Sequence, residues 1–158
     1  GDVDHAYRMK LVNRVPAARR SQLEFLPITS PEELPAVIAR HDVGLALEAG
    51  IPASRNYTIT NKILQYFNAG LGVLASGTAG QREVLARAPD AGHVVDLNET
   101  GELTQLLDAL LADPARLAAM GAAARRAAEE CYCWEKEISR LVAAVERALK
   151  SPVPAASK

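Results

Sequence analysis

The stretch from Thr58 to Gln65 holds polar side chains that could bind an anion. Asn61, Lys62 and Gln65 interrupt a run that otherwise reads as a buried helix leading into a buried strand. Thr58 and Thr60 place two hydroxyl groups just before the expected start of that helix. A helix N-terminus presents unpaired N–H groups and a partial positive charge, so hydroxyls and a lysine beside it suit a phosphate. The pattern is compatible with an anion site but is too general to identify one.

The spacing of the polar residues places three of them on one side of the helix. Asn61 and Gln65 are four positions apart and Asn68 follows three later, so they form one stripe, opposite the apolar side chains. Such a stripe ordinarily faces water, and this interpretation stays open. A ligand-facing stripe is favoured by the charges nearby, because no carboxylate occurs between Glu48 and Glu83.

Strand-like and helix-like segments alternate along the chain. Four short apolar runs have the length of strands: Gln22 to Ile28, Asp42 to Glu48, Gly72 to Ser76 and Gly92 to Leu97. Helix signals fall between and after them: a helix from Asp4 to Val15, a capping box at Ser30 and Glu33 opening a helix to about His41, a helix capped by Thr60 and ended by Gly70, and helices at about Gln81 to Ala86, Thr100 to Ala112, Pro114 to Cys131 and Glu135 to Lys150.

This alternation predicts an α/β fold with a Rossmann-like parallel sheet flanked by helices on both faces and closed by two or more C-terminal helices. Ligands bind such sheets at the carboxyl ends of the strands. The segment from Glu48 to Asn61 is the longest strand-to-helix connection and is rich in polar residues and glycine. We therefore expect the functional site beside this loop.

Composition limits the partners. The chain has 158 residues, 49% of them apolar, and a formal charge of −1, which suits one domain with a sizeable core and argues against nucleic-acid binding. No apolar run approaches the roughly 20 residues of a membrane span. We expect a cytoplasmic protein, with peripheral membrane contact left open, and a disordered tail at residues 151–158.

Several residues that could bind a metal do not form a metal motif. Cys131 and Cys133 make half a site at best and read as structural thiols. His5, His41 and His93 are scattered, and the acidic triplet that starts at Asp2 precedes a helix instead of ending a strand. We expect no metal site.

Three segments together resemble one family. Ser54 to Val84, "SRNYTITNKILQYFNAGLGVLASGTAGQREV", resembles the donor-binding segment in the C-terminal domain of the retaining GT-B glycosyltransferases, the glycosyl transferase group 1 family. Leu34 to Leu47 resembles the helix and strand that precede this segment, and Ala91 to Glu135 resembles the closing region. The resemblance implies that the chain is part of the C-terminal half of a GT-B fold, with residues 1–150 forming a nucleotide-sugar-binding domain.

The resemblance also assigns roles to residues. Asn61 and Lys62 fall at the end of the helix that faces the donor diphosphate, with Thr58 and Thr60 beside it. Gln65 occupies the position of a glutamate that binds the ribose, and Tyr57 that of a second glutamate eight positions earlier. Both replacements depart from the usual pattern, since an amide lacks the charge that strengthens a carboxylate hydrogen bond.

The implied activity is transfer of a sugar from a nucleotide diphosphate sugar to an acceptor with retention, as in hexosyltransferases. Lys62 and the helix amides would stabilise the leaving diphosphate without a metal. The family's acceptor domain and the first two strands of the donor domain have no counterpart in this sequence, so we expect the chain alone to be inactive. We also expect unpaired sheet edges, a rearranged sheet or an oligomer. A non-catalytic nucleotide-binding or interaction module and a related sugar epimerase remain alternatives.

Overall fold

The computed structural model describes residues 3–150, and the expected disordered tail at 151–158 lies outside them. The chain divides into two compact units, one ending at Val37 and the other beginning at Ile38. Each unit is described by itself.

The first unit contains one regular helix and an irregular segment. Helix α1 (His5–Arg14) starts at Asp4, whose carboxylate accepts a hydrogen bond from the Tyr7 N–H at 3.0 Å, as an N-cap does. The short 3₁₀ helix η1 (Ala17–Gln22) follows. The Arg8 guanidinium lies 4.7 Å from the centre of the Phe25 ring, so a cation–π contact links α1 to the irregular segment.

The strand predicted at Gln22 to Ile28 is wrong. Gln22 ends η1, and the residues after it form no helix or strand up to the turn at Pro31. Strands need a neighbouring strand for their backbone groups, and within residues 3–150 the sheet contains no strand from this segment. Pro27 lacks an N–H, and Ile28 is 74% exposed, so the run satisfies neither the hydrogen bonding nor the burial of an inner strand.

The helix expected from Ser30 to His41 is shorter than predicted. One bond of the capping box is present, with the Glu33 N–H donating to Ser30 Oγ at 3.3 Å, and the Glu33 carboxylate accepts from the Ser30 hydroxyl at 3.2 Å. A turn occupies residues 31–33, and α2 spans only Leu34–Ile38.

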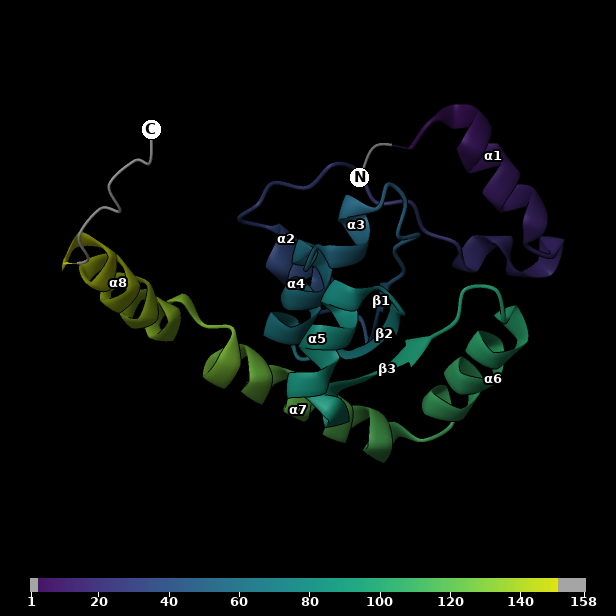
Figure 1. Cartoon of the computed structure of the whole chain (residues 1–158). Helices are drawn as coiled ribbons and strands as arrows, with labels where there is room; N and C mark the ends of the chain where they lie inside the picture. The colour runs from purple at the N-terminus through teal and green to yellow at the C-terminus, as the bar shows by residue number, and fades with distance from the viewer. Residues whose placement is uncertain (1–2, 151–158) are drawn as a thin grey trace. The chain divides into compact units, whose positions relative to one another are not determined.

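The second unit is built on a three-stranded parallel sheet. The strands β1 (Val43–Ala46), β2 (Gly72–Ser76) and β3 (Gly92–Val95) lie in the order β1-β2-β3 (Figure 1). All pairs are parallel, with Leu45 opposite Leu74 and Ala75 opposite Val94. The predicted α/β, Rossmann-like class is therefore confirmed. Among the described residues β1 and β3 each pair on one side only.

The helices of this unit follow the predicted order. They are α3 (Ser54–Tyr57), α4 (Asn61–Ala69), α5 (Ala79–Arg87), the 3₁₀ helix η2 (Pro89–Ala91), α6 (Thr100–Leu111), α7 (Pro114–Cys131) and α8 (Trp134–Lys150). Only α3 and η2 were not predicted. Asp113 caps α7 by accepting from the Arg116 N–H at 2.9 Å, and the predicted C-terminal helices are confirmed.

Two groups of buried apolar side chains hold the sheet and helices together. One joins β1 and β2 to α4, α5 and the middle of α7, with Ile63, Phe67 and Val84 fully buried. The other joins β2 and β3 to α6 and the start of α7 through Leu74, Val95, Leu110 and Met120. The predicted cover on both faces is therefore present at β2, whose five residues are all buried. This cover is incomplete at the edge strand β1, where Leu45 is 42% exposed.

Two close contacts fix α4 in place. Gly44 of β1 leaves room for the ring of Tyr66, with which a Cβ atom at position 44 would overlap. Four positions after Tyr66, Gly70 ends α4 in the left-handed conformation with φ 71°, which glycine adopts without strain. The Arg125 side chain of α7 donates to the Asn68 carbonyl oxygen at 2.5 Å, which satisfies one of the free carbonyls at the helix end.

Candidate functional site

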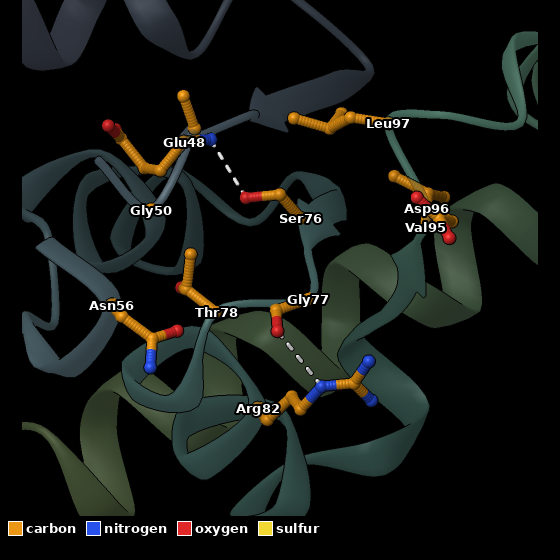
Figure 2. A pocket seen from close by; sticks show the side chains of 11 residues that line it. Glu48, Gly50, Asn56, Ser76, Gly77, Thr78, Arg82, Val95, Asp96 and Leu97 are labelled. Atoms are coloured by element: carbon orange, nitrogen blue, oxygen red, sulfur yellow. Dashed lines mark hydrogen bonds between the residues drawn. The ribbon is translucent and has the colours of Figure 1, made fainter. Parts of the chain in front are cut away.

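A cavity of about 410 Å³ lies where the three strands end. Its walls come from the segments that follow β1, β2 and β3 and from one residue each of α3 and α5 (Figure 2). The lining residues include Glu48, Asn56, Thr78, Arg82 and Asp96. This is the expected position for a ligand in a parallel α/β sheet, and the volume is within the usual range for small-molecule sites.

Glu48 is the buried carboxylate of this site, with 7% of its surface exposed. Its backbone N–H donates to Ser76 Oγ at 2.8 Å, and the Ser76 hydroxyl donates to Gln81 Oε1 at 3.2 Å (Figure 2 shows the first of these bonds). Ser76 and Gln81 are also buried. The chain of hydrogen bonds therefore ties the end of β1 to β2 and α5.

Two cations meet at the Glu48 carboxylate. Lys62, in the first turn of α4, lies with Nζ 2.8 Å from Oε1, and Arg55 of α3 lies with Nη1 3.6 Å from Oε2. A buried carboxylate needs such partners, because removing a charge from water is costly. The two cationic side chains stay 55% and 62% exposed, respectively, so each can also meet a ligand from solvent.

The loop between β2 and α5 forms the floor of the cavity. Arg82 Nε donates to the Gly77 carbonyl oxygen at 3.1 Å, and a Cβ atom at position 77 would lie only 2.6 Å from Arg82 Nη2. Asn56 Oδ1 accepts from the Ala79 N–H at 3.2 Å and so caps the start of α5 from another helix. Figure 2 shows these side chains around the cavity. The lining offers hydrogen-bond donors and acceptors, and it carries both negative side chains, Glu48 and Asp96, and a positive one, Arg82.

The start of α4 keeps hydrogen-bonding capacity. Thr60 occupies the predicted N-cap position with extended backbone, but its side chain makes no capping hydrogen bond. Its Oγ1 atom is buried without a partner among the described residues. The first N–H groups of α4 therefore lack the side-chain acceptor that a threonine cap normally supplies.

The remaining predicted site residues lie at the surface of the same segment. Tyr57 is 76% exposed at the end of α3, and the Thr58 hydroxyl donates to the Ser54 carbonyl oxygen at 2.9 Å. Asn61 and Gln65 are exposed on α4, as the stripe predicts. The structure therefore brings Lys62 to a buried carboxylate and leaves the other five on α4, at the end of α3 and in the loop between these helices.

Sequence reasoning missed the acid that pairs with Lys62. Glu48 lies fourteen positions before Lys62 and was treated only as the boundary of a segment without carboxylates. A signal was present, because Glu48 ends an apolar run of strand length, where ligand-binding side chains of a parallel sheet gather. Ser76 carried the same signal, because it ends the apolar run from Gly72, whereas Asn56 and Gln81 carried none.

Gly80 and Glu83, near the start of α5, have separate structural roles. A Cβ atom at Gly80 would overlap with the Thr58 carbonyl, so glycine lets α5 pack against the loop before α4. Glu83 forms an exposed ion pair with Arg87 at 3.3 Å one turn later in α5.

The other candidate ligand groups lie elsewhere. His93 in β3 contacts Arg116 of α7, with 3.0 Å between Nε2 and Nη2, and its pKa is lowered by burial and by the Arg116 charge. Cys131 and Cys133 are free thiols. Among residues 3–150 no three histidine, cysteine or acidic side chains are grouped as a metal site would require, and no helix is long and apolar enough to cross a membrane.

Comparison with known proteins supports one family. Residues 7–143 match the glycosyl transferase-like family. A 66-residue stretch is 41% identical to the GDP-mannose-dependent monoacylated alpha-(1-6)-phosphatidylinositol monomannoside mannosyltransferase of Corynebacterium glutamicum. That stretch is 42% of this chain and 17% of the relative, so the match spans a small part of the longer protein. Because the family match extends over most of the sequence, this chain belongs to the glycosyl transferase-like family.

Proposed function

We propose that the chain is the donor-binding part of a retaining GT-B glycosyltransferase and corresponds to part of the C-terminal half of that fold. The observation that carries the proposal is the position of Lys62. Its ammonium group is held at 2.8 Å by buried Glu48, in the first turn of α4, next to the cavity at the strand ends. A cation, free helix N–H groups and an adjoining polar cavity suit a diphosphate with a sugar attached.

In the proposed mechanism the diphosphate lies at the start of α4. As the bond between the sugar and the diphosphate breaks, negative charge grows on the leaving oxygen. Lys62 and the N–H groups of the first turn stabilise this charge, because Glu48 holds Lys62 in position before the reaction begins. No protein nucleophile and no metal ion is assigned a step.

The neighbouring residues bind the rest of the donor. Asn61, Thr58 and Thr60 contribute polar groups at the diphosphate end, and Gln65, one turn further along α4, hydrogen-bonds the ribose through its amide. Tyr57 is exposed on the same segment and contacts the base or the sugar. The cavity, lined by Glu48, Arg82 and Asp96 among others, receives the transferred sugar.

The relative suggests the first donor to test. It is described as GDP-mannose-dependent, so GDP and GDP-mannose are the first probes for the full-length protein. The acceptor is a saccharide or another hydroxyl compound that binds outside residues 1–150, which form the nucleotide-sugar-binding domain. We propose a cytoplasmic enzyme of the hexosyltransferase type.

Nucleotide binding by variants tests the proposal. Lys62→Ala and Gln65→Ala should each weaken binding of the nucleoside diphosphate in calorimetry, whereas Gln105→Ala, on the exposed side of α6, should not. A panel of other nucleoside diphosphates covers a different base preference. Unchanged affinity in both site variants would remove α4 from the donor site.

A non-catalytic nucleotide-binding module is the second candidate. It is favoured by Gln65 and Tyr57, which stand where the family usually has glutamates. Tight GDP-mannose binding with no release of GDP in the presence of acceptor lipids or sugars would support it.

A further inference from the structure

We propose that Arg55 is a second diphosphate-binding cation and that Glu48 is a positioning residue that holds Arg55 and Lys62 together. This inference rests on the proposed function, because it assumes a nucleotide diphosphate at the start of α4. It adds a residue from a different helix, α3, and assigns a role to the buried carboxylate.

Arg55 and Lys62 both pair with the Glu48 carboxylate. They contact its two different oxygens, at 3.6 Å and 2.8 Å. The two cations come from separate short helices, α3 and α4, and meet only because Glu48 stands between them. Two positive charges on one carboxylate leave one net positive charge at this point.

Burial distinguishes Glu48 from an ordinary surface partner. Its side chain is 7% exposed, whereas those of Arg55 and Lys62 are 62% and 55% exposed. The carboxylate is therefore the fixed member, further secured by the hydrogen bond from its backbone N–H to Ser76. Long cationic side chains lose rotamer freedom when they bind, so holding them beforehand lowers the entropic cost of ligand binding.

The Arg55 contact leaves capacity for a ligand. The distance of 3.6 Å between Arg55 and Glu48 suits an ion pair but is too long for a hydrogen bond. The five N–H donors of the guanidinium therefore stay available for a ligand. Its planar fork matches two phosphate oxygens at once. Arg82, the cation on the cavity floor, donates through Nε to Gly77, whereas Arg55 shares the Glu48 carboxylate with Lys62 and is therefore the better placed partner.

The first experiment measures how much Arg55 contributes to the binding of GDP. Calorimetry on the full-length protein compares wild type with Arg55→Met and with Arg87→Met, an exposed arginine that pairs with a carboxylate on α5. Loss of one charge-assisted contact should weaken GDP binding about tenfold in Arg55→Met. Arg87→Met should bind as wild type does, and guanosine, which has no phosphate, should bind equally to all three proteins.

Two further variants separate the effect of the Arg55 charge from that of its planar shape. Arg55→Lys, which keeps the charge but loses the planar fork, should restore only part of the affinity, and Arg55→Gln should restore none. The loss should shrink at high salt, since an exposed charge is screened. Equal GDP affinity in Arg55→Met and Arg87→Met would overturn the role of Arg55, and so would an equal loss of guanosine binding.

The positioning role of Glu48 has its own test. Glu48→Gln should weaken GDP binding several-fold in the wild-type background, because both cations lose their anchor. It should have no effect on GDP affinity in an Arg55→Met/Lys62→Met background. A purely structural role predicts the same loss in both backgrounds, and tighter GDP binding by Glu48→Gln would also overturn the positioning role.

Failure of this inference is distinct from failure of the proposed function. If Lys62→Met weakens GDP binding and Arg55→Met does not, only the second cation is wrong. If no nucleoside diphosphate in the panel binds the wild-type protein, the proposed function itself fails.

Discussion

Gly121 of α7 lies directly against the carbonyl oxygen of Gly70, the residue that ends α4. A Cβ atom at position 121 would overlap with this oxygen, so the two helices approach as closely as their backbones allow. Gly121 is buried, as are Met120 before it and Ala123 two positions after it. The end of the helix that carries Lys62 therefore depends on a glycine that lies 59 positions after Lys62 in the sequence.

Gly121→Ala should destabilise the protein, because α7 and α4 must move apart to admit one methyl group. Overpacking of this kind typically costs about 1–3 kcal/mol. Urea denaturation measures it. Gly101→Ala is the matched control, since no atom lies within 4 Å of its added Cβ, and it should be neutral or stabilising. Equal stability of the two variants would contradict the close approach.

Phe67→Ala should be among the most destabilising single changes. Phe67 is fully buried and packs edge-on against Tyr132, with 6.1 Å between ring centroids. Truncation of a buried phenylalanine costs about 3–5 kcal/mol. Tyr132→Phe keeps the ring and loses only the 3.3 Å hydrogen bond to the Val84 carbonyl, so it should cost about 1 kcal/mol. Thermal and urea unfolding would compare the stability losses of the two variants. A larger loss in Tyr132→Phe would contradict the central place of Phe67 in the core.

Ser76→Ala should destabilise the fold and lower nucleotide affinity together. The change leaves the Glu48 N–H and the Gln81 amide without the Ser76 hydroxyl, at a cost of about 1–3 kcal/mol for buried polar groups left unpaired. Ser139→Ala, at an exposed position on α8, serves as the control. Unchanged unfolding of Ser76→Ala would mean that water replaces the hydroxyl at no cost.

Stability should decrease in mildly acidic solution through His93. Its pKa in the folded protein is lowered, first by burial and then by Arg116. The unfolded chain therefore binds a proton at a higher pH, near 6.5, and favours unfolding as the pH falls through this value. His93→Gln should lose less stability between pH 7.5 and pH 5.5 than wild type does. Arg116→Met should raise the His93 pKa in an NMR titration, and an unmoved titration would exclude the charge effect.

Gln65→Glu should strengthen nucleotide binding if Gln65 contacts the ribose. A carboxylate forms stronger hydrogen bonds to hydroxyl groups than an amide does, which corresponds to a gain of up to about tenfold in affinity. GDP should gain, whereas a nucleotide without ribose hydroxyls should not. A gain that is equal for both would point to a general effect of charge.

Local patterns predicted the elements of the second unit well. β2 was predicted at its observed limits, Gly72–Ser76, because its apolar run is bounded by glycine on both sides. α4 was placed correctly by Thr60 and Gly70, and α7 by Asp113 and Pro114. Such caps and breakers act within a few residues, so they can be read from sequence alone.

The errors arose where the outcome depends on distant partners. Leu23 and Phe25 alternate as in a strand, yet no strand among residues 3–150 pairs with them. Glu48 and Lys62 meet only after β1 and α4 have packed together. Arg55 joined them through α3, a single turn of helix that the polar loop sequence did not reveal. The stripe on α4 showed which residues are exposed but not which acid Lys62 would contact.

The contact between Gly44 and Tyr66 has a consequence for protein engineering. Position 44 has no functional group, but its missing side chain lets α4 lie close enough to β1 for Lys62 to reach Glu48. A design that transplants Lys62, Arg55 and Glu48 into another scaffold would need this strand glycine as well. Without it, α4 would hold Lys62 too far from the sheet for its ammonium group to reach Glu48.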